Sequence, residues 1–227
     1  MLKVDTVRTS YKNTQIFRCV LCSGMFLNVL YFILNQGYFS YLKESMMFLT
    51  FWGHNFEIMF FMLLTRKTYE LQNMKTEEFE KEMQKSFMAH LQSTVLGMQF
   101  LITFFYWIVI FNKNEERTPF QWYKDIYMHS VPLIIIFWEM LLNRMEIRMK
   151  HLKLTMIIIV FYGFVNLFFT LFNGEPVYNA LDFQNMRSVL FLVGALITSV
   201  FGVVFFQSIQ TAKLKFVNHR ENKLRND

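Results

Sequence analysis

Long apolar stretches alternate with charged segments along the whole chain. A helix rises ~1.5 Å per residue, so about 20 apolar residues cross the ~30 Å hydrocarbon core of a bilayer. Six stretches have about this length: residues 16–34, 46–64, 87–111, 126–142, 154–172 and 189–207. The pattern therefore predicts an all-α polytopic membrane protein, a bundle of six transmembrane helices.

Lys and Arg are distributed unequally between the two sides that six spans create. The two terminal segments, with Arg18 at the start of the first span, and the second and fourth connections share one side. They carry 18 of the 23 basic residues, against 5 on the other side. The positive-inside rule places both termini in the cytosol, or in the matrix if the membrane is mitochondrial. The net charge of +6 thus reflects topology and anionic lipid headgroups, and no nucleic-acid partner is predicted.

The spans divide the chain into an inner-side segment (1–15), the six-span domain (16–210) and a basic tail (211–227), which we expect to fray without a partner. Within residues 65–86, apolar side chains recur at helical spacing, which predicts an amphipathic helix on the inner surface. Cys19 and Cys22 form a CxxC inside the first span, but no second ligand pair accompanies them. We therefore interpret them as packing residues and predict no cofactor or metal.

Polar residues inside the spans are the candidates for chemistry, because a polar group in hydrocarbon costs free energy and faces the bundle interior. Thr50, His54 and Glu57 fall at i, i+4 and i+7, on one helix face. His129 lies one turn into the fourth span, and Pro132 predicts a bend just after it. Thr50 and His129 share a depth of ~5–6 Å below the outer boundary.

The carboxylates in the spans give less support to a catalytic site than Thr50 and His129 do. Glu139 lies ~15 Å deeper than His129, so no carboxylate in the spans is placed to orient the imidazole. The structural alternative is a Thr bonded to the carbonyl one turn back and a His that packs. A haem or ion site using His54, His90 and His129 is a further alternative without a supporting spacing.

Several short motifs, in order, resemble one known family. They are FLTF (residues 48–51) at the head of a span, FYWIVIF (105–111) before a charged loop, Met128-His129 followed by Pro132, and Gly174 followed by Val177-Tyr178. Together they are similar to the androgen-induced and androgen-dependent regulator family of multi-pass hydrolases. The resemblance covers the topology of residues 17–210, and its motifs cover about thirty residues. Gly53 replaces a polar residue, and Glu57 stands where the family pattern has Gln.

The resemblance implies hydrolysis of fatty acid esters of hydroxy fatty acids. Thr50 matches the family's proposed nucleophile and His129 its partner. A Thr hydroxyl needs a base in hydrogen-bond reach, which His129 supplies. An oxyanion donor is also needed, and His54 and Tyr178 are the candidates, with Glu57 as a further supporting residue. The partners expected are membrane lipids and a lipid-ester substrate.

The alternative function is a non-catalytic accessory subunit of a large membrane complex, such as a mitochondrial respiratory complex. The 28 Phe and 16 Met suit extensive contact with lipids and between helices without specifying chemistry. The family resemblance favours an endomembrane or plasma membrane location, whereas a subunit role favours the mitochondrial inner membrane.

Overall fold

The computed structural model describes Arg18, Val20, Ser23, Gly24, Leu27, Leu34 and residues 47–71, 73–111, 115–178 and 181–226. The regular elements in these parts of the chain are all helices, with no β-strand among them. Four segments are long and apolar enough to cross a membrane: Phe87–Ile110, Pro119–Leu142, Met149–Asn173 and Met186–Arg220. The prediction of an all-α, multi-pass membrane protein is therefore confirmed.

The first two predicted spans are not among these four. Most of residues 16–34, including Cys19 and Cys22, lies outside the described residues. The second predicted span corresponds to α3 (Leu49–Glu70), which has 22 residues but a lower hydropathy because it contains His54, Asn55 and Glu57. The six-span count stays a prediction.

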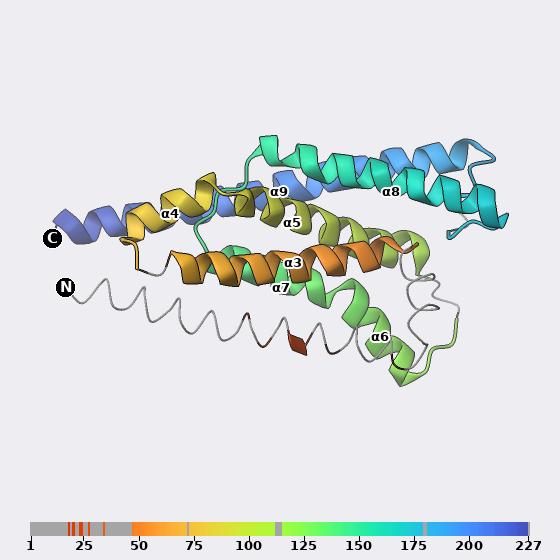
Figure 1. Cartoon of the computed structure of the whole chain (residues 1–227), viewed down its shortest axis with the longest axis horizontal. Coiled ribbons are helices and arrows are strands. Elements are labelled where there is room, and N and C mark those ends of the chain that lie inside the picture. Colours follow the sequence, from red (N-terminus) through yellow and green to blue (C-terminus); the bar gives the residue numbers. More distant parts are fainter. Residues whose placement is uncertain are drawn as a thin grey trace.

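Helix α5 (Phe87–Phe105), which continues as the π-helix η1 (Tyr106–Ile110), is the central element. It contacts α3, α7 (Val131–Leu142), α8 (Leu152–Asn173) and α9 (Met186–Asn226). The most apolar stretch of this candidate span is 61% buried, against 22–28% for the corresponding stretches of the other three candidate spans. Figure 1 shows α8 and α9 on one side of α5, with α3 and α7 on the other. Residues on α5 are thus placed to reach both halves of the bundle.

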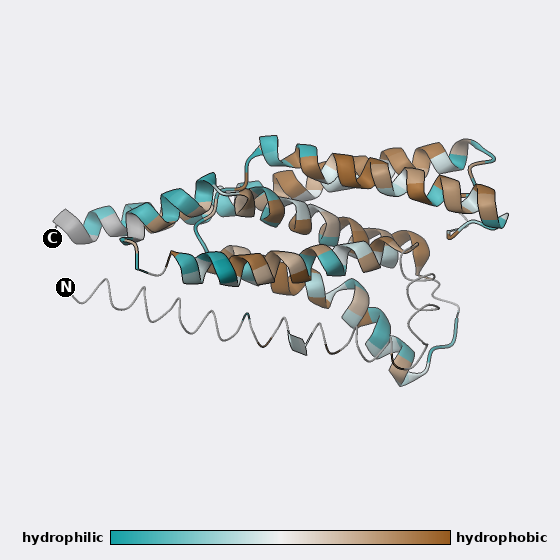
Figure 2. Cartoon of the chain, in the orientation of Figure 1, coloured by the Kyte–Doolittle hydropathy of each residue, from teal (hydrophilic) through white to brown (hydrophobic). Residues whose placement is uncertain are grey.

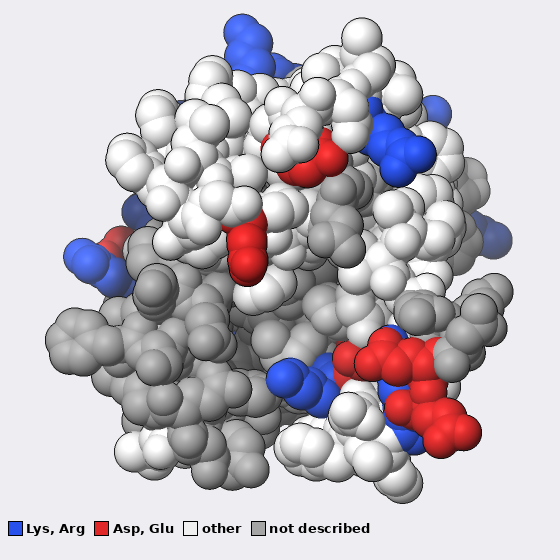
Figure 3. Space-filling view, turned by 90° about the vertical axis from the view of Figure 1, so that its right-hand side faces the viewer, with Lys and Arg blue, Asp and Glu red and all other residues white. Residues whose placement is uncertain are grey.

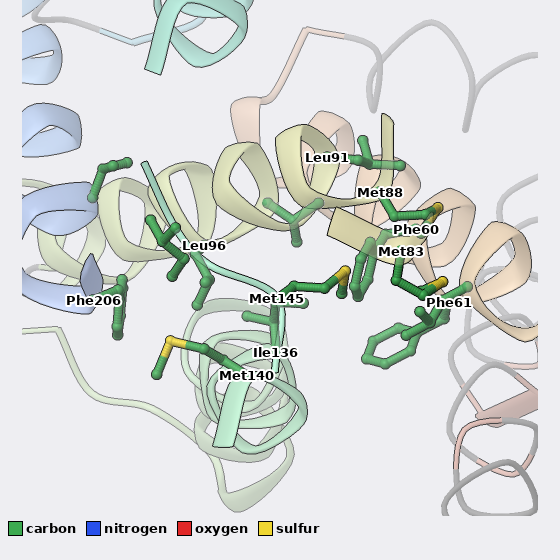
Figure 4. Close-up of a cluster of buried hydrophobic side chains, with 14 of the residues drawn as sticks. Phe60, Phe61, Met83, Met88, Leu91, Leu96, Ile136, Met140, Met145 and Phe206 are labelled. Atoms are coloured by element: carbon green, nitrogen blue, oxygen red, sulfur yellow. The ribbon is translucent and has the colours of Figure 1, made fainter. Parts of the chain in front are cut away.

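A buried apolar cluster joins α3, α5, α7 and α9. Figure 4 shows how its side chains converge from different helices. It includes Phe60, Phe61, Met83, Met88, Leu91, Leu96, Ile136, Met140, Met145 and Phe206. Because lipid tails are as apolar as these side chains, close packing is what holds the helices together within a bilayer.

The predicted amphipathic helix at 65–86 is divided in the structure. Helix α3 continues to Glu70, and α4 (Thr76–Lys85) is a separate short helix. Phe79 and Met83 of α4 are buried, so its apolar face packs on the bundle as the spacing predicted.

The basic tail, which we expected to fray, is helical as far as Asn226 because α9 runs on without a break. Lys213 Nζ donates to the carbonyls of Met140 (2.9 Å), Leu141 (3.3 Å) and Asn143 at the end of α7. Those carbonyls have no partner inside α7, so the lysine caps that helix. These bonds hold α9 in place beyond the apolar span.

The fourth predicted span is two helices, and it begins earlier than residue 126. Thr118 caps α6 (Pro119–His129) by accepting the Gln121 backbone N–H, and Pro119 occupies the first helical position. The chain then leaves helical geometry at Ser130 (φ −125°), and α7 follows with Pro132 in its first turn. The predicted bend is confirmed, and it leaves His129 at the end of α6.

Polar and apolar residues are separated along the length of the bundle. In Figure 2 the middle of α8 and α9 is apolar, whereas α4 and the last part of α9 are hydrophilic. Figure 3 looks onto the opposite end, where α8 and α9 are joined. Acidic side chains gather at one edge there, and much of the remaining described surface is uncharged.

Candidate functional site

The side chains of Thr50 and His129 meet, with Thr50 Oγ1 3.4 Å from His129 Nδ1. Thr50 is in the first turn of α3 and is 9% exposed, and His129 is the last residue of α6. This distance is at the long end for a hydrogen bond. In enzyme active sites, hydrogen bonds that are long without substrate often tighten when it binds.

The break at Pro132 explains how His129 is held. Proline has no N–H, so Pro132 cannot donate to the carbonyl of Met128, its acceptor in a continuous helix. His54 Nε2 donates to that carbonyl instead, at 3.2 Å. His54 therefore carries its proton on Nε2 and acts as a positioning residue for the end of α6. An unpaired carbonyl at this point would cost free energy.

Helix α5 and the π-helix hold the imidazole from another side. Thr103 Oγ1 donates to the His129 carbonyl at 2.5 Å. The Tyr106 ring stacks on the imidazole, with ring centroids 3.5 Å apart and an interplanar angle of 15°. Tyr106 begins η1, and π-helical turns are frequently found at functional sites because the extra residue re-aims side chains.

The site also contains a carboxylate that sequence analysis did not find. Asp125 lies one turn before His129 on α6, within electrostatic range of the imidazole. Its carboxylate accepts from Arg117 Nε at 2.9 Å, and Tyr106 lies close to it. The i, i+4 spacing of Asp125 and His129 is the signal in the sequence. We missed it because Asp125 was assigned to the loop before the span.

An apolar cavity of about 150 Å³ opens beside the Thr50–His129 pair. Residues from α3, α5, η1, α6, α8, α9 and the loop between α8 and α9 line it. Its polar lining residues are Thr50, Tyr106, His129, Tyr162 and Tyr178. The cavity thus places a hydroxyl and an imidazole against a chamber suited to hydrocarbon.

Tyr178 reaches this cavity from the loop after α8, which ends at Gly174 in the left-handed conformation (φ 74°). Its ring packs edge-on against Phe48, with ring centroids 5.8 Å apart. Burial raises the pKa of the Tyr178 phenol above its usual value. The hydroxyl therefore stays protonated, and able to donate, throughout the neutral pH range.

Two of the five predicted site residues do not line the cavity. His54 is occupied with the Met128 carbonyl. Glu57 is fully buried two turns after Thr50 on α3, where its Oε2 accepts from Gln99 Nε2 at 2.7 Å. Thr50, His129 and Tyr178 are brought together, whereas Glu57 is not part of their cluster.

The remaining buried polar side chains form separate clusters. Arg18 and Glu139 make a two-fold ion pair, Nε–Oε2 at 2.8 Å and Nη2–Oε1 at 2.6 Å. His90 lies against His151, with ring centroids 4.1 Å apart. Among the described residues, no group of three or more His, Cys, Asp and Glu side chains could hold a metal ion.

Comparison with known proteins gives no relative for this chain: no family model, curated protein or solved structure matches it.

Proposed function

We propose that this protein is a membrane-embedded hydrolase that cleaves fatty acid esters of hydroxy fatty acids, as its resemblance to the androgen-induced and androgen-dependent regulator family implies. The observation that carries the proposal is the 3.4 Å approach of Thr50 Oγ1 to His129 Nδ1 at an apolar cavity. A six-span bundle in an endomembrane or the plasma membrane, built from α3, the stretch at residues 16–34 and the four candidate spans, is part of this proposal.

The reaction begins with attack by Thr50 Oγ1 on the ester carbonyl. His129 Nδ1 takes the hydroxyl proton as the C–O bond forms, so the imidazole carries its other proton on Nε2. When the tetrahedral intermediate collapses, His129 returns the proton to the departing oxygen of the hydroxy fatty acid. Water, activated by the same nitrogen, then hydrolyses the acyl-Thr50 ester and restores the free hydroxyl.

Two groups are suited to stabilise the developing oxyanion. One is the backbone N–H of Thr50, which lies in the first turn of α3, where the carbonyl one turn back is outside the helix. The protonated Tyr178 hydroxyl lies on the same cavity. His54 is not assigned to this role because its donor is already used. Removing one such donor costs about 100- to 1,000-fold in kcat in other acyl-transfer enzymes.

Asp125 supplies negative charge for the imidazolium that forms in each half of the reaction. It acts within a network, since Arg117 pairs with it and Tyr106, whose ring stacks on the imidazole, lies close to it. The arrangement differs from a Ser-His-Asp triad, in which the carboxylate bonds directly to the imidazole and sets its tautomer.

The test is release of fatty acid from a fatty acid ester of a hydroxy fatty acid by the purified protein in detergent. Thr50→Ala and His129→Ala are expected to lose at least 1,000-fold, as in other hydrolases that lose a nucleophile or base. Thr170→Ala is the matched control, because the Thr170 hydroxyl also lies in a span but bonds the Asn166 carbonyl away from the cavity. It should keep wild-type activity.

Unchanged turnover in Thr50→Ala would overturn the proposed nucleophile. A wild-type protein that releases no fatty acid, and that migrates with a larger assembly on native gels, would instead favour the accessory-subunit alternative. Mass spectrometry of a denatured reaction mixture adds an independent readout, since an acyl group trapped on Thr50 identifies the intermediate directly.

A further inference from the structure

Ile102 of α5 lines the cavity and is 4% exposed. Gly53, one turn after Thr50 on α3, faces this side chain. A Cβ added at Gly53 would lie 2.3 Å from Ile102 Cδ1. The tip of Ile102 therefore fills the space that any other residue at position 53 would occupy.

A buried polar pair lies beside the Gly53–Ile102 contact. The same added Cβ would lie 3.3 Å from Gln99 Nε2, and that amide donates to the buried Glu57 carboxylate. Hydrocarbon that passed Ile102 would meet this pair, and separating buried polar groups from their partners costs free energy. Ile102 thus separates the cavity from this pair near Gly53, an apolar side chain before a hydrogen-bonded one.

We propose that Ile102, seated on Gly53, sets the length of the acyl chain that the cavity accepts. Thr50 lies one turn above Gly53 on α3, so an ester carbonyl at Thr50 Oγ1 directs its acyl chain towards Ile102. An apolar protein cavity of about 150 Å³ holds a ligand of about six carbon atoms. The preferred substrates are esters of acyl groups of about this length, with the alcohol part extending into the lipid.

This specificity rests on the proposed hydrolase function. The proposal predicts opposite effects for substitutions of Ile102 and of Gly53, the two residues in contact. Ile102→Ala removes most of this side chain and deepens the cavity. Gly53→Ala drives the Ile102 tip into the cavity and makes it shallower, because that tip is the movable partner of the contact.

The experiment measures hydrolysis of p-nitrophenyl esters with acyl chains of two to sixteen carbons. Each buried methylene strengthens binding about fourfold. If Ile102→Ala makes room for about two more methylenes, the rate on the ten-carbon ester relative to the six-carbon ester should rise about tenfold over the wild-type ratio. Gly53→Ala should lower the six-carbon to two-carbon ratio. Ile136→Ala removes an equally buried isoleucine outside the cavity, and should leave both ratios unchanged.

A second readout separates this inference from the hydrolase proposal. In a Thr50→Ala background, native mass spectrometry of retained fatty acids of four to sixteen carbons reports the length limit without turnover. If no variant hydrolyses any ester, a limit that still lengthens in Ile102→Ala supports the role of Ile102 and removes only the chemistry. If Ile102→Ala changes neither the hydrolysis profile nor the retained lengths, the inference is overturned.

Discussion

At the scale of single residues, the site depends on side chains that repair breaks in the backbone. Pro132 removes the donor that Met128 would have had, and His54 replaces it from another helix. The stripe of Thr50, His54 and Glu57 could be predicted from helical spacing alone. That His54 serves a carbonyl could not, because the sequence does not show which helix lies opposite.

His54→Ala is expected to destabilise the protein by ~1–3 kcal/mol, the cost of leaving a buried carbonyl without its partner. His54→Gln should recover part of this loss, since its amide can donate to Met128. The measurement is chemical unfolding in detergent. Asn55→Ala is the neighbouring control: the Asn55 side chain is exposed and bonds only within its own helix turn. Equal stability of His54→Ala and Asn55→Ala would contradict the positioning role.

At the scale of elements, three local irregularities shape the site: the first turn of α3, the break between α6 and α7, and the π-helix after α5. The break was predictable because Pro132 follows His129 closely. The π-helix was not, since FYWIVIF has the same apolar pattern in an α- or a π-helix. The stack of Tyr106 on His129, and the link to Asp125, were therefore invisible in the sequence.

Pro132→Ala is expected to make α6 and α7 one continuous helix, because residue 132 can then donate to Met128. His129 would move away from Thr50, and a displacement of ~1 Å can cost about 100-fold in rate. Ester hydrolysis should fall while thermal stability holds or rises, and hydrogen exchange should slow across residues 128–136. Full activity together with unchanged exchange would show that the break does not position the imidazole.

At the scale of the whole molecule, the buried Arg18–Glu139 pair connects the N-terminal part of the chain to α7. Both side chains are 2% exposed, and Asn143 adds a further bond to the carboxylate at 3.2 Å. The apolar spans were readable from composition because each must face lipid. This pairing was not, since it joins residues 121 positions apart, and Arg18 was counted among the inner-side loop charges.

Glu139→Leu alone should destabilise the protein by ~3–5 kcal/mol, because it leaves a buried guanidinium without its carboxylate. The double variant Arg18→Met with Glu139→Leu should recover most of this loss, since an apolar pair of similar volume is frequently neutral or stabilising. Thermal unfolding in detergent compares the two. If the double variant is no more stable than Glu139→Leu, the loss does not come from leaving Arg18 without its carboxylate.

The length of α9 has a practical consequence for imaging. Its 41 residues extend about 60 Å at ~1.5 Å per residue, roughly twice the hydrocarbon thickness of a bilayer. A soluble fiducial domain fused in helical phase with this rod would stand clear of the detergent micelle in a fixed orientation. Particle alignment in cryo-electron microscopy, otherwise difficult for a 27.5 kDa chain, then becomes practical without altering the cavity end of the bundle.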